Sequence, residues 1–554
     1  MDINYQLKFI LNSINRLQQI QDSESISPSF GSFCYPYWRD KVSDFSDARY
    51  QEAGATMLLL KHDKFNNFRN KFDCLDQRSL YSSFASALLF LDKIQNKDGS
   101  FDEWYKGEHG FAATEFNIIA YGLAYYFLKN KIKKRELNLL IKIINKAANW
   151  LIKNNDFTKS NHQAAAGAAL IISYEVTKNL KFKIGAKEKI DSILKRQKKE
   201  GWFSEVGGMD LGYCSVLLDY VMIYHYFSKD KSVLMPMKKL FFFIKNFIQP
   251  DFSISKEAGL CLNPYVSRTG FLLLSKFDHK IRDFFYFLQS KESTFKSVSS
   301  FLSDDLRLCR WSYLPIINYL LLEKSFKIKK EKGCYTDFFK LGWRVFNESK
   351  LSTYKSKNLN IFFSAAGGGV LRAYDSEKLI FEDSGYYIKC KNKNYCHNGY
   401  DRYRSIKFSK TGISFITNFG TTKFFFPTFI SKVILRLICK SALLSKIARR
   451  MIDFIRIKKQ TALNQSSAPL SSKVEGFLLS RAISINEKKI YILDKISIPF
   501  EVSNSSLEIK FSSSIKQRNV KNHDCLSKEF FIKKEIDLNF NLLLVETSNK
   551  NIFN

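Results

Sequence analysis

Apolar residues recur at helical spacing through the first 345 residues of the chain. In residues 1–20, Leu7, Ile10 and Ile14 fall at the intervals that place side chains on one face of a helix. The same spacing predicts further helices over about 46–61, 77–95, 111–130, 135–154, 162–178, 185–198, 211–228 and 232–248. Strand patterns are almost absent before residue 350, so this part of the chain is predicted to be helical.

Residues 94–103 and 196–205 repeat one pattern, in which a helix ends in a polar turn with a glycine and an aromatic residue follows. Gly99 and Gly201 occupy equivalent positions and suit the left-handed backbone conformation that ends a helix. A fainter copy lies at residues 152–157. Helical hairpins repeated in this way predict a solenoid or a closed ring. A ring would gather such turns at one end, around a common cleft.

After about residue 345 the pattern changes to short alternating segments separated by Gly, Asn, Asp and Ser, which is typical of antiparallel strands. Strands are predicted at 359–364, 370–374, 378–381, 413–416, 476–479, 489–493 and 507–511. A chain of 554 residues is also too long for one compact core. We therefore expect a multidomain α+β protein, with an (α/α) helical-hairpin toroid over residues 1–345 and an antiparallel β-sandwich over residues 346–554.

A strongly basic amphipathic helix is predicted at about 427–459, where it interrupts the strands. One interpretation is a helix that makes peripheral contact with an anionic membrane surface. The other is an inserted helix that caps the sheet and leaves its basic face in water. The second is the simpler interpretation, and the sequence leaves both open.

Composition adds a strong positive charge to this picture. The chain holds 87 Lys and Arg against 53 Asp and Glu, a formal net charge of +34. Such a charge favours polyanionic partners, although a general bias toward Lys, Asn, Ile and Phe explains it equally well. If the charge serves an acidic glycan, positive potential should concentrate along the cleft. Nucleic acid is not an expected partner, because the basic residues are spread and no recognition motif is present.

Cysteine usage and hydropathy bear on cofactors and location. The ten Cys residues are scattered, with no CxxC pair and no zinc-ligand spacing, so neither a metal nor another cofactor is expected. The N-terminal segment lacks the uninterrupted apolar stretch of a signal peptide, and no window is long and apolar enough to span a bilayer. We therefore expect a cytoplasmic protein.

The strongest functional signals lie in two turns, each just ahead of a long apolar helix. Asn161 and His162 precede a run of small residues, and Glu205 and Tyr213 flank a turn with several glycines. Each has a structural alternative: Asn161 could cap its helix, His162 could be a hydrogen-bonded structural residue, and Tyr213 belongs to a chain rich in tyrosine. Glu205 and Glu103, at matching repeat positions, could be paired carboxylates or could stabilise helix N-termini.

A helical ring followed by a β-sandwich resembles the heparinase II/III-like proteins and related alginate lyases. The residues that carry the resemblance are Asn161-His162 ahead of small residues, Trp-Phe-Ser-Glu at 202–205 with Gly212-Tyr213, Cys-Leu-Asn-Pro-Tyr-Val-Ser-Arg at 261–268, Gly-Gly-Gly-Val at 367–370 and Phe-Glu-Asp-Ser-Gly-Tyr at 381–386. The resemblance covers most of the chain, and its motifs are short. Ser160 departs from the family pattern, which usually has a second Asn there.

The resemblance implies β-elimination at a uronic acid. In that chemistry Asn161 would hold the sugar carboxylate, His162 would be a base or a second carboxylate contact, and Tyr213 would be the acid or base. Substrate-binding roles are expected for Arg268, Glu205, Trp202 and Tyr265.

Two functions from different classes are therefore expected. The first is a polysaccharide lyase, or a related carbohydrate-active protein, that acts on an acidic polysaccharide or glycan intermediate. The alternative is a non-catalytic glycan-binding or assembly protein in surface polysaccharide biosynthesis. The absence of an export signal leaves room for the alternative, since a lyase for an extracellular polymer would normally carry one.

Overall fold

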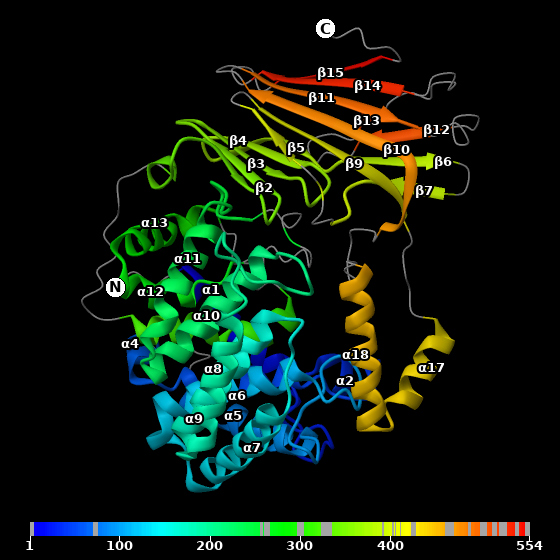
Figure 1. Ribbon diagram of the computed structural model, residues 1–554. Helices are drawn as coiled ribbons and strands as arrows, with labels where there is room; N and C mark the ends of the chain where they lie inside the picture. The colour runs from blue at the N-terminus through cyan, green and yellow to red at the C-terminus, as the bar shows by residue number, and fades with distance from the viewer. Residues whose placement is uncertain are drawn as a thin grey trace.

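The chain forms a helical domain followed by a β domain (Figure 1). The structure is a computed structural model, and it describes residues 5–69, 76–254, 259, 266–295, 304–322, 335–390, 393–400, 404, 406–409, 412–422, 428–459, 470–485, 489–498, 507–511, 518–519, 529–537 and 542–548. The predicted fold class, a helical toroid followed by an antiparallel sandwich, is confirmed.

An inner ring of helices is the core of the first domain. Each packs against the next, and the last returns to the first. In ring order they are α3 (Glu52–Leu59), α6 (Phe111–Leu128), α8 (Ser160–Thr177), α10 (Leu211–Ser228), α12 (Thr269–Leu274) and α16 (Tyr313–Leu321). These helices are buried around most of their circumference, which explains why they are apolar on nearly every face. Small residues let them approach closely, since a Cβ on Gly122 of α6 would lie 2.2 Å from Ile172 of α8.

Outer helices cover the ring, each with one apolar face turned inward. They are α1 (Tyr5–Ile20), α5 (Gln77–Ile94), α7 (Lys134–Lys153), α9 (Leu180–Leu194), α11 (Leu234–Lys245) and α13 (His279–Phe295). In α7, for example, the buried residues Leu140, Ile144 and Leu151 recur at helical spacing. Shorter helices complete the described part of the domain: α2 (Tyr35–Trp38), η1 (Ala48–Gln51), η2 (Asp63–Phe65), α4 (Asn66–Arg69), η4 (Lys129–Lys131), η5 (Lys231–Val233), η7 (Ser275–Phe277), α15 (Asp305–Trp311) and η8 (Tyr335–Phe338).

The repeated glycine turns have the predicted backbone conformation. Gly99 has φ +97° and Gly201 has φ +105°. A Cβ on Gly99 would lie 2.4 Å from the carbonyl oxygen of Lys146, and one on Gly201 would lie 2.7 Å from that of Lys239. Each turn therefore needs glycine for two reasons, the left-handed conformation and the close approach of the next outer helix.

Two antiparallel sheets form the β domain. The first is a meander of β1 (Gly342–Phe346), β2 (Leu351–Lys355), β3 (Leu359–Ser364), β4 (Val370–Asp375) and β5 (Lys378–Asp383). The second has the order β13-β12-β6-β7-β9-β10-β11-β14-β15, with β8 paired to β9. Its strands are β6 (Tyr386–Cys390), β7 (Lys393–Cys396), β8 (Ile406–Phe408), β9 (Gly412–Thr422), β10 (Leu470–Ile485), β11 (Lys489–Ser497), β12 (Leu507–Phe511), β13 (Arg518–Asn519), β14 (Glu529–Asp537) and β15 (Leu542–Ser548).

One hydrophobic core lies between these sheets, as in a sandwich. The ring of Phe363 in the first sheet, for instance, lies 5.4 Å from that of Phe415 in the second. All seven predicted strands coincide with observed ones. β1 begins at Gly342, just before the predicted boundary at residue 345, in a region where the sequence gives little strand pattern.

The inserted basic segment is a helical hairpin, whereas the sequence predicted one helix. α17 (Phe429–Ile438) and α18 (Ala442–Lys459) are separated by a short turn. Ser441 explains the break, because its hydroxyl accepts a hydrogen bond from the backbone N–H of Leu444 and so caps the second helix. The hairpin lies beside the helical domain in Figure 1 and does not cap the sheet. Its contacts with that domain are described below.

Polar contacts join the two domains. The carboxylate of Glu200, in the second repeat turn, accepts hydrogen bonds from the backbone N–H groups of Glu348 (2.6 Å) and Ser349 (3.0 Å). The backbone N–H of Met209 donates to the hydroxyl of Tyr400, a residue of the β domain, at 2.9 Å. Met209 lies in the turn that leads to Tyr213, so the second contact joins that turn to the β domain.

Candidate functional site at the ring mouth

Four inner helices, α3, α6, α8 and α10, begin at the same end of the ring. Titratable side chains from these helix starts and the loops before them meet there, and we call five of them the mouth cluster: Arg49, Glu103, Glu115, His162 and Glu205. Side-chain contacts of Arg49 with Glu103 and of His162 with Glu115, and a hydrogen bond from the backbone N–H of Asn161 to Glu205, link segments that are distant in sequence and that the ring brings together.

His162 lies in the first turn of α8 with its side chain 15% exposed. Its Nδ1 atom is 3.4 Å from a carboxylate oxygen of Asp156 and 3.8 Å from one of Glu115. The imidazole lies parallel to the ring of Phe111 and edge-on to that of Phe116. Rings on two sides and carboxylates on a third restrict its orientation, while part of it stays open to solvent.

Asn161 is almost fully buried. Its backbone N–H donates to Glu205 at 3.4 Å, and its side-chain oxygen has no hydrogen-bond partner among the described residues. The N-cap position of α8 is Lys159, so helix capping does not explain Asn161. A buried amide oxygen without a partner costs roughly 1–3 kcal/mol, and as an acceptor it suits a hydrogen-bond donor such as a hydroxyl group.

Two buried carboxyl groups flank the Asn161-His162 pair. Burial raises the pKa of Glu205 well above its usual value, Lys159 opposes this, and Asp156 adds to it. Burial likewise raises the pKa of Glu115, and Asp156 adds to that shift. Both groups are therefore biased toward the protonated, neutral form, in which a carboxyl can donate a hydrogen bond.

Two arginines lie on the other side of the mouth: Arg49, within the mouth cluster, and Arg310, beside it. Arg49 pairs with Glu52 at 2.7 Å and lies 4.0 Å above the centre of the Phe116 ring. Arg310 lies 3.0 Å from Glu103, which is also 3.9 Å from Arg49. Glu103 and Glu205 therefore have different partners. Sequence reasoning missed Arg49 and Arg310, since no local pattern connects positions so far apart.

Carboxyl groups prevail over cations among these side chains. The predicted concentration of positive potential along the cleft between the ring and the β domain stays a prediction. Burial offsets part of the negative charge, because it raises the pKa of Glu52 to about 7 as well as those of Glu115 and Glu205.

The remaining predicted site residues differ in burial and in their hydrogen-bond partners. Tyr213 is half-buried in the first turn of α10, where Asp210 accepts a hydrogen bond from its backbone N–H at 2.9 Å. Arg268 is buried just before α12. Trp202 packs in the ring core, and its indole N–H donates to Glu200 at 3.2 Å. Tyr265 lies outside the described residues.

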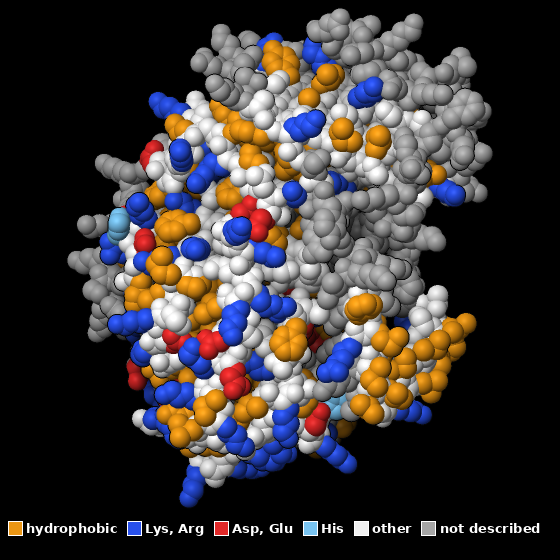
Figure 2. Space-filling model, viewed as in Figure 1, with side chains coloured by type: hydrophobic (Ala, Val, Ile, Leu, Met, Phe, Trp, Pro, Cys, Tyr) orange, Lys and Arg blue, Asp and Glu red, His pale blue; other side chains and the backbone are white. Residues whose placement is uncertain are grey.

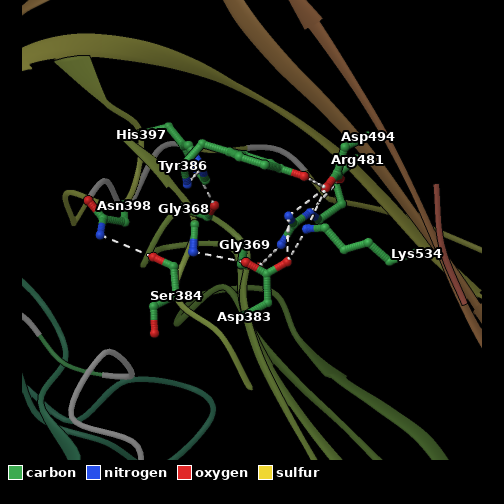
Figure 3. Close-up of polar contacts among 11 residues, drawn as sticks. Gly368, Gly369, Asp383, Ser384, Tyr386, His397, Asn398, Arg481, Asp494 and Lys534 are labelled. Carbon is green, nitrogen blue, oxygen red and sulfur yellow. Dashed lines mark hydrogen bonds and ion pairs between the residues drawn. The ribbon is translucent and has the colours of Figure 1, made fainter. Parts of the chain in front are cut away.

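A second polar cluster lies inside the β domain (Figure 3). Arg481 contacts Asp494 at 2.6 Å and Asp383 at 2.8 Å, and Lys534 contacts the same two carboxylates at 3.1 and 2.7 Å. Tyr386 donates its hydroxyl to Asp494 at 2.6 Å. All five side chains are buried and their charges are matched, so this cluster ties the sheets together and is not open to a ligand.

The described residues contain no group of three or more His, Cys, Asp or Glu side chains arranged to hold a metal ion. His397, which is near two cysteines in sequence, instead bonds the carbonyl oxygen of Gly368 at 2.8 Å and accepts from the backbone N–H of Tyr386 at 2.9 Å.

Comparisons with known proteins bear on the fold. No protein-family profile matches the sequence, and no curated protein matches it. A chondroitin AC lyase of Streptomyces coelicolor A3, solved in complex with chondroitin sulphate, is similar with a TM-score of 0.55 and 7% sequence identity, over 91% of this chain and 67% of that chain. A chondroitinase AC lyase studied with oligosaccharides has a TM-score of 0.51 and 8% identity, over 91% of this chain and 68% of that chain.

Heparinase III aligns over 99% of this chain and 89% of its own with 10% identity, but its TM-score of 0.37 is too low to support an argument. At these identities the likeness concerns the fold alone. The chain therefore has the fold of polysaccharide lyases built from a helical toroid and an antiparallel sheet domain, which confirms the predicted resemblance at the level of fold.

Proposed function

We propose that this protein is a polysaccharide lyase that cleaves an acidic, uronic-acid-containing glycan by β-elimination. One observation carries the proposal: the amide of Asn161, whose oxygen is buried without a partner among the described residues, adjoins the partly exposed imidazole of His162 at the ring mouth. The lyase fold supports it.

In this proposal the sugar carboxylate lies against Asn161. β-Elimination breaks the C5–H bond and the C4–O bond of the uronate and leaves a C4–C5 double bond. The C5 proton is poorly acidic while the carboxylate keeps its full charge, so hydrogen-bond donors against that carboxylate stabilise the developing negative charge. The amide nitrogen of Asn161 is one donor, while its oxygen would accept from a sugar hydroxyl, and a protonated Glu205 beside it is a second donor.

His162 then takes the C5 proton. The nearby carboxylate of Asp156 favours the ring orientation in which the other imidazole nitrogen faces the sugar. Tyr213, at the start of the neighbouring helix, returns a proton to the departing C4 oxygen. Arg268 offsets the charge of the polymer.

The test is the ultraviolet absorbance of the unsaturated uronate product with a panel of acidic polysaccharides. His162→Ala and Tyr213→Phe should each lower turnover by roughly 10²–10⁴, the usual worth of a positioned proton-transfer group. His279→Ala and Tyr126→Phe, at exposed positions elsewhere on the ring, are matched controls and should leave turnover unchanged. Near-normal turnover in both test variants would overturn the assignment.

The alternative is a glycan-binding protein without catalysis in surface polysaccharide assembly. The buried carboxyl groups at the mouth favour it, because Glu115 and Glu205 in their neutral form can donate hydrogen bonds to a bound glycan without any elimination. It predicts glycan binding that depends on Asn161 and His162, with no unsaturated product from any polysaccharide in the panel.

A further inference from the structure

The hairpin of α17 and α18 exposes large apolar side chains over most of its length. No residue of α17 is buried. Phe429 is 82% exposed and Ile430 68%, and on α18 Leu443 is 67% exposed and Phe454 65%. Figure 2 shows the resulting patch, where hydrophobic side chains gather over α17 more densely than elsewhere on this face. Soluble proteins seldom leave so continuous an apolar surface in water, so we expect this surface to bind a partner.

The exposed apolar residues follow helical periodicity. On α17, Ile430, Ile434 and Leu437 fall at four- and three-residue intervals and so share one face. On α18, Leu444, Met451 and Phe454 likewise share a face, at intervals of seven and three residues. Each helix therefore has an apolar face without a protein partner in the described structure, and neither face serves the hydrophobic core of the ring or the sandwich.

The charge of this segment identifies the chemistry of the missing partner. Residues 428–459 contain nine Lys and Arg and a single acidic residue, Asp453. Exposed apolar side chains in a strongly basic segment suit a bilayer with anionic headgroups. The acyl chains can bury the apolar side chains, and the phosphates attract the Lys and Arg side chains. No helix among the described residues is long and apolar enough to cross a membrane, so the hairpin would lie along the surface.

The turn of the hairpin contacts the rim of the ring. Arg436 pairs with Asp44 at 2.5 Å, and a Cβ on Gly107 would lie 2.5 Å from the carbonyl oxygen of Cys439. Asp44 and Gly107 belong to the loops that precede α3 and α6, the helices whose starts form part of the mouth. A surface bound by the hairpin would therefore lie beside the opening of the candidate site.

We propose that the α17–α18 hairpin is a membrane anchor that inserts its apolar face into the interface of an anionic bilayer and holds the ring mouth close to that surface. The anchor is independent of catalysis. A soluble polyanion would engage the basic residues and leave the apolar face in water, and a second copy of the chain would bring two strongly basic surfaces together.

The experiment is sedimentation of the full chain with vesicles of neutral phosphatidylcholine or of phosphatidylcholine with 30% phosphatidylglycerol. The protein should sediment with the anionic vesicles and far less with the neutral ones. The double variant Ile434→Gln and Leu437→Gln keeps every charge but removes two apolar side chains from the face. It should lower the partition coefficient for anionic vesicles at least about tenfold, because each side chain removed forfeits its burial in the interface.

The matched control is Ile26→Gln with Leu180→Gln, two exposed apolar residues of the helical domain at 90% and 64% exposure. It should bind as the unchanged protein does. Because all four positions are exposed, both proteins should fold normally, and circular dichroism checks this. Equal vesicle binding by the hairpin variant and the control would overturn the proposal, since general positive charge would then account for binding. Dimers that dissociate in the hairpin variant, without vesicle binding by the unchanged protein, would also overturn it.

Discussion

Two histidines of this chain, His162 and His397, have opposite surroundings. His162 is partly exposed and faces carboxylates, so its environment suits proton transfer. His397 is fully buried, and both ring nitrogens are engaged by the backbone. Burial, aided by Arg481 and Arg404 and opposed by Asp383 and Asp494, lowers the pKa of His397 to about 3.

The stability of the β domain should consequently depend on pH through His397. The unfolded chain binds a proton at this residue below about pH 6.5, whereas the folded chain does so only near pH 3. Stability from this group is therefore complete above pH 6.5 and is lost as the pH falls toward 3, by about 1.4 kcal/mol per pH unit within the window. Urea unfolding at pH 7 and pH 5 measures it.

His397→Gln removes the titrating group and should give a shallower loss of stability between pH 7 and pH 5 than the unchanged protein. Comparing the two slopes cancels the contributions of other groups, including Glu52, whose raised pKa acts in the opposite direction. Equal slopes in the two proteins would show that His397 is not the group responsible.

At the same scale, the sequence could indicate Asn161 and His162 because they lie in one turn ahead of one helix. It could not indicate Arg49, Arg310 or Tyr400. Arg310, on α15, reaches Glu103 only after α15 packs against α3 as the ring closes, and Tyr400 reaches Met209 only after the sheet docks. Local patterns predict neighbours along the chain, whereas these contacts depend on the arrangement of whole elements.

The helices and strands themselves follow from local pattern to a large degree. The helices of the inner and outer rings follow the predicted ranges up to α11, although α9 begins five residues before its predicted start and α3 begins six residues after its own. The inserted segment was predicted as one helix because its amphipathic pattern continues through Cys439, and only the cap at Ser441 separates the two parts. The glycine turns were predicted from repetition, and their close packing explains why the repetition exists.

Gly99→Ala tests the repeated turn. Its Cβ would meet the carbonyl oxygen of Lys146, in addition to the strain of a left-handed conformation, which costs roughly 1–2 kcal/mol by itself. Gly342→Ala is a matched control, since Gly342 has φ +91° and no heavy atom near the position of its Cβ. Urea unfolding should show a larger loss of stability for Gly99→Ala. An equal loss in both would mean that backbone conformation alone requires the glycine.

For the whole molecule, the contacts between the ring and the sandwich set the position of the β domain over the mouth. Glu200 lies at this junction, in the repeated glycine turn that follows α9. Its carboxylate also accepts hydrogen bonds from the start of the β domain. Glu200 therefore belongs to the repeated turn of the ring and also holds the β domain against the ring. No sequence pattern indicated this second role.

Glu200→Ala should weaken this junction. It removes the acceptor for two backbone N–H groups and for the indole of Trp202, so we expect a loss of about 1–3 kcal/mol in the free energy of unfolding. Thermal unfolding followed by calorimetry measures it, with the exposed Glu188→Ala on α9 as the control. If both variants unfold as the unchanged protein does, Glu200 does not hold the domains together.

The common direction of α3, α6, α8 and α10 has an electrostatic consequence. Peptide dipoles add along a helix, and each N-terminus carries the equivalent of roughly half a positive charge. Four such ends converge on the mouth, where Glu103, Glu115 and Glu205 gather. The backbone thus adds positive potential to that of Arg49 and Arg310, and this potential helps the fold to tolerate buried carboxyl groups at the mouth and to receive an anionic sugar beside them.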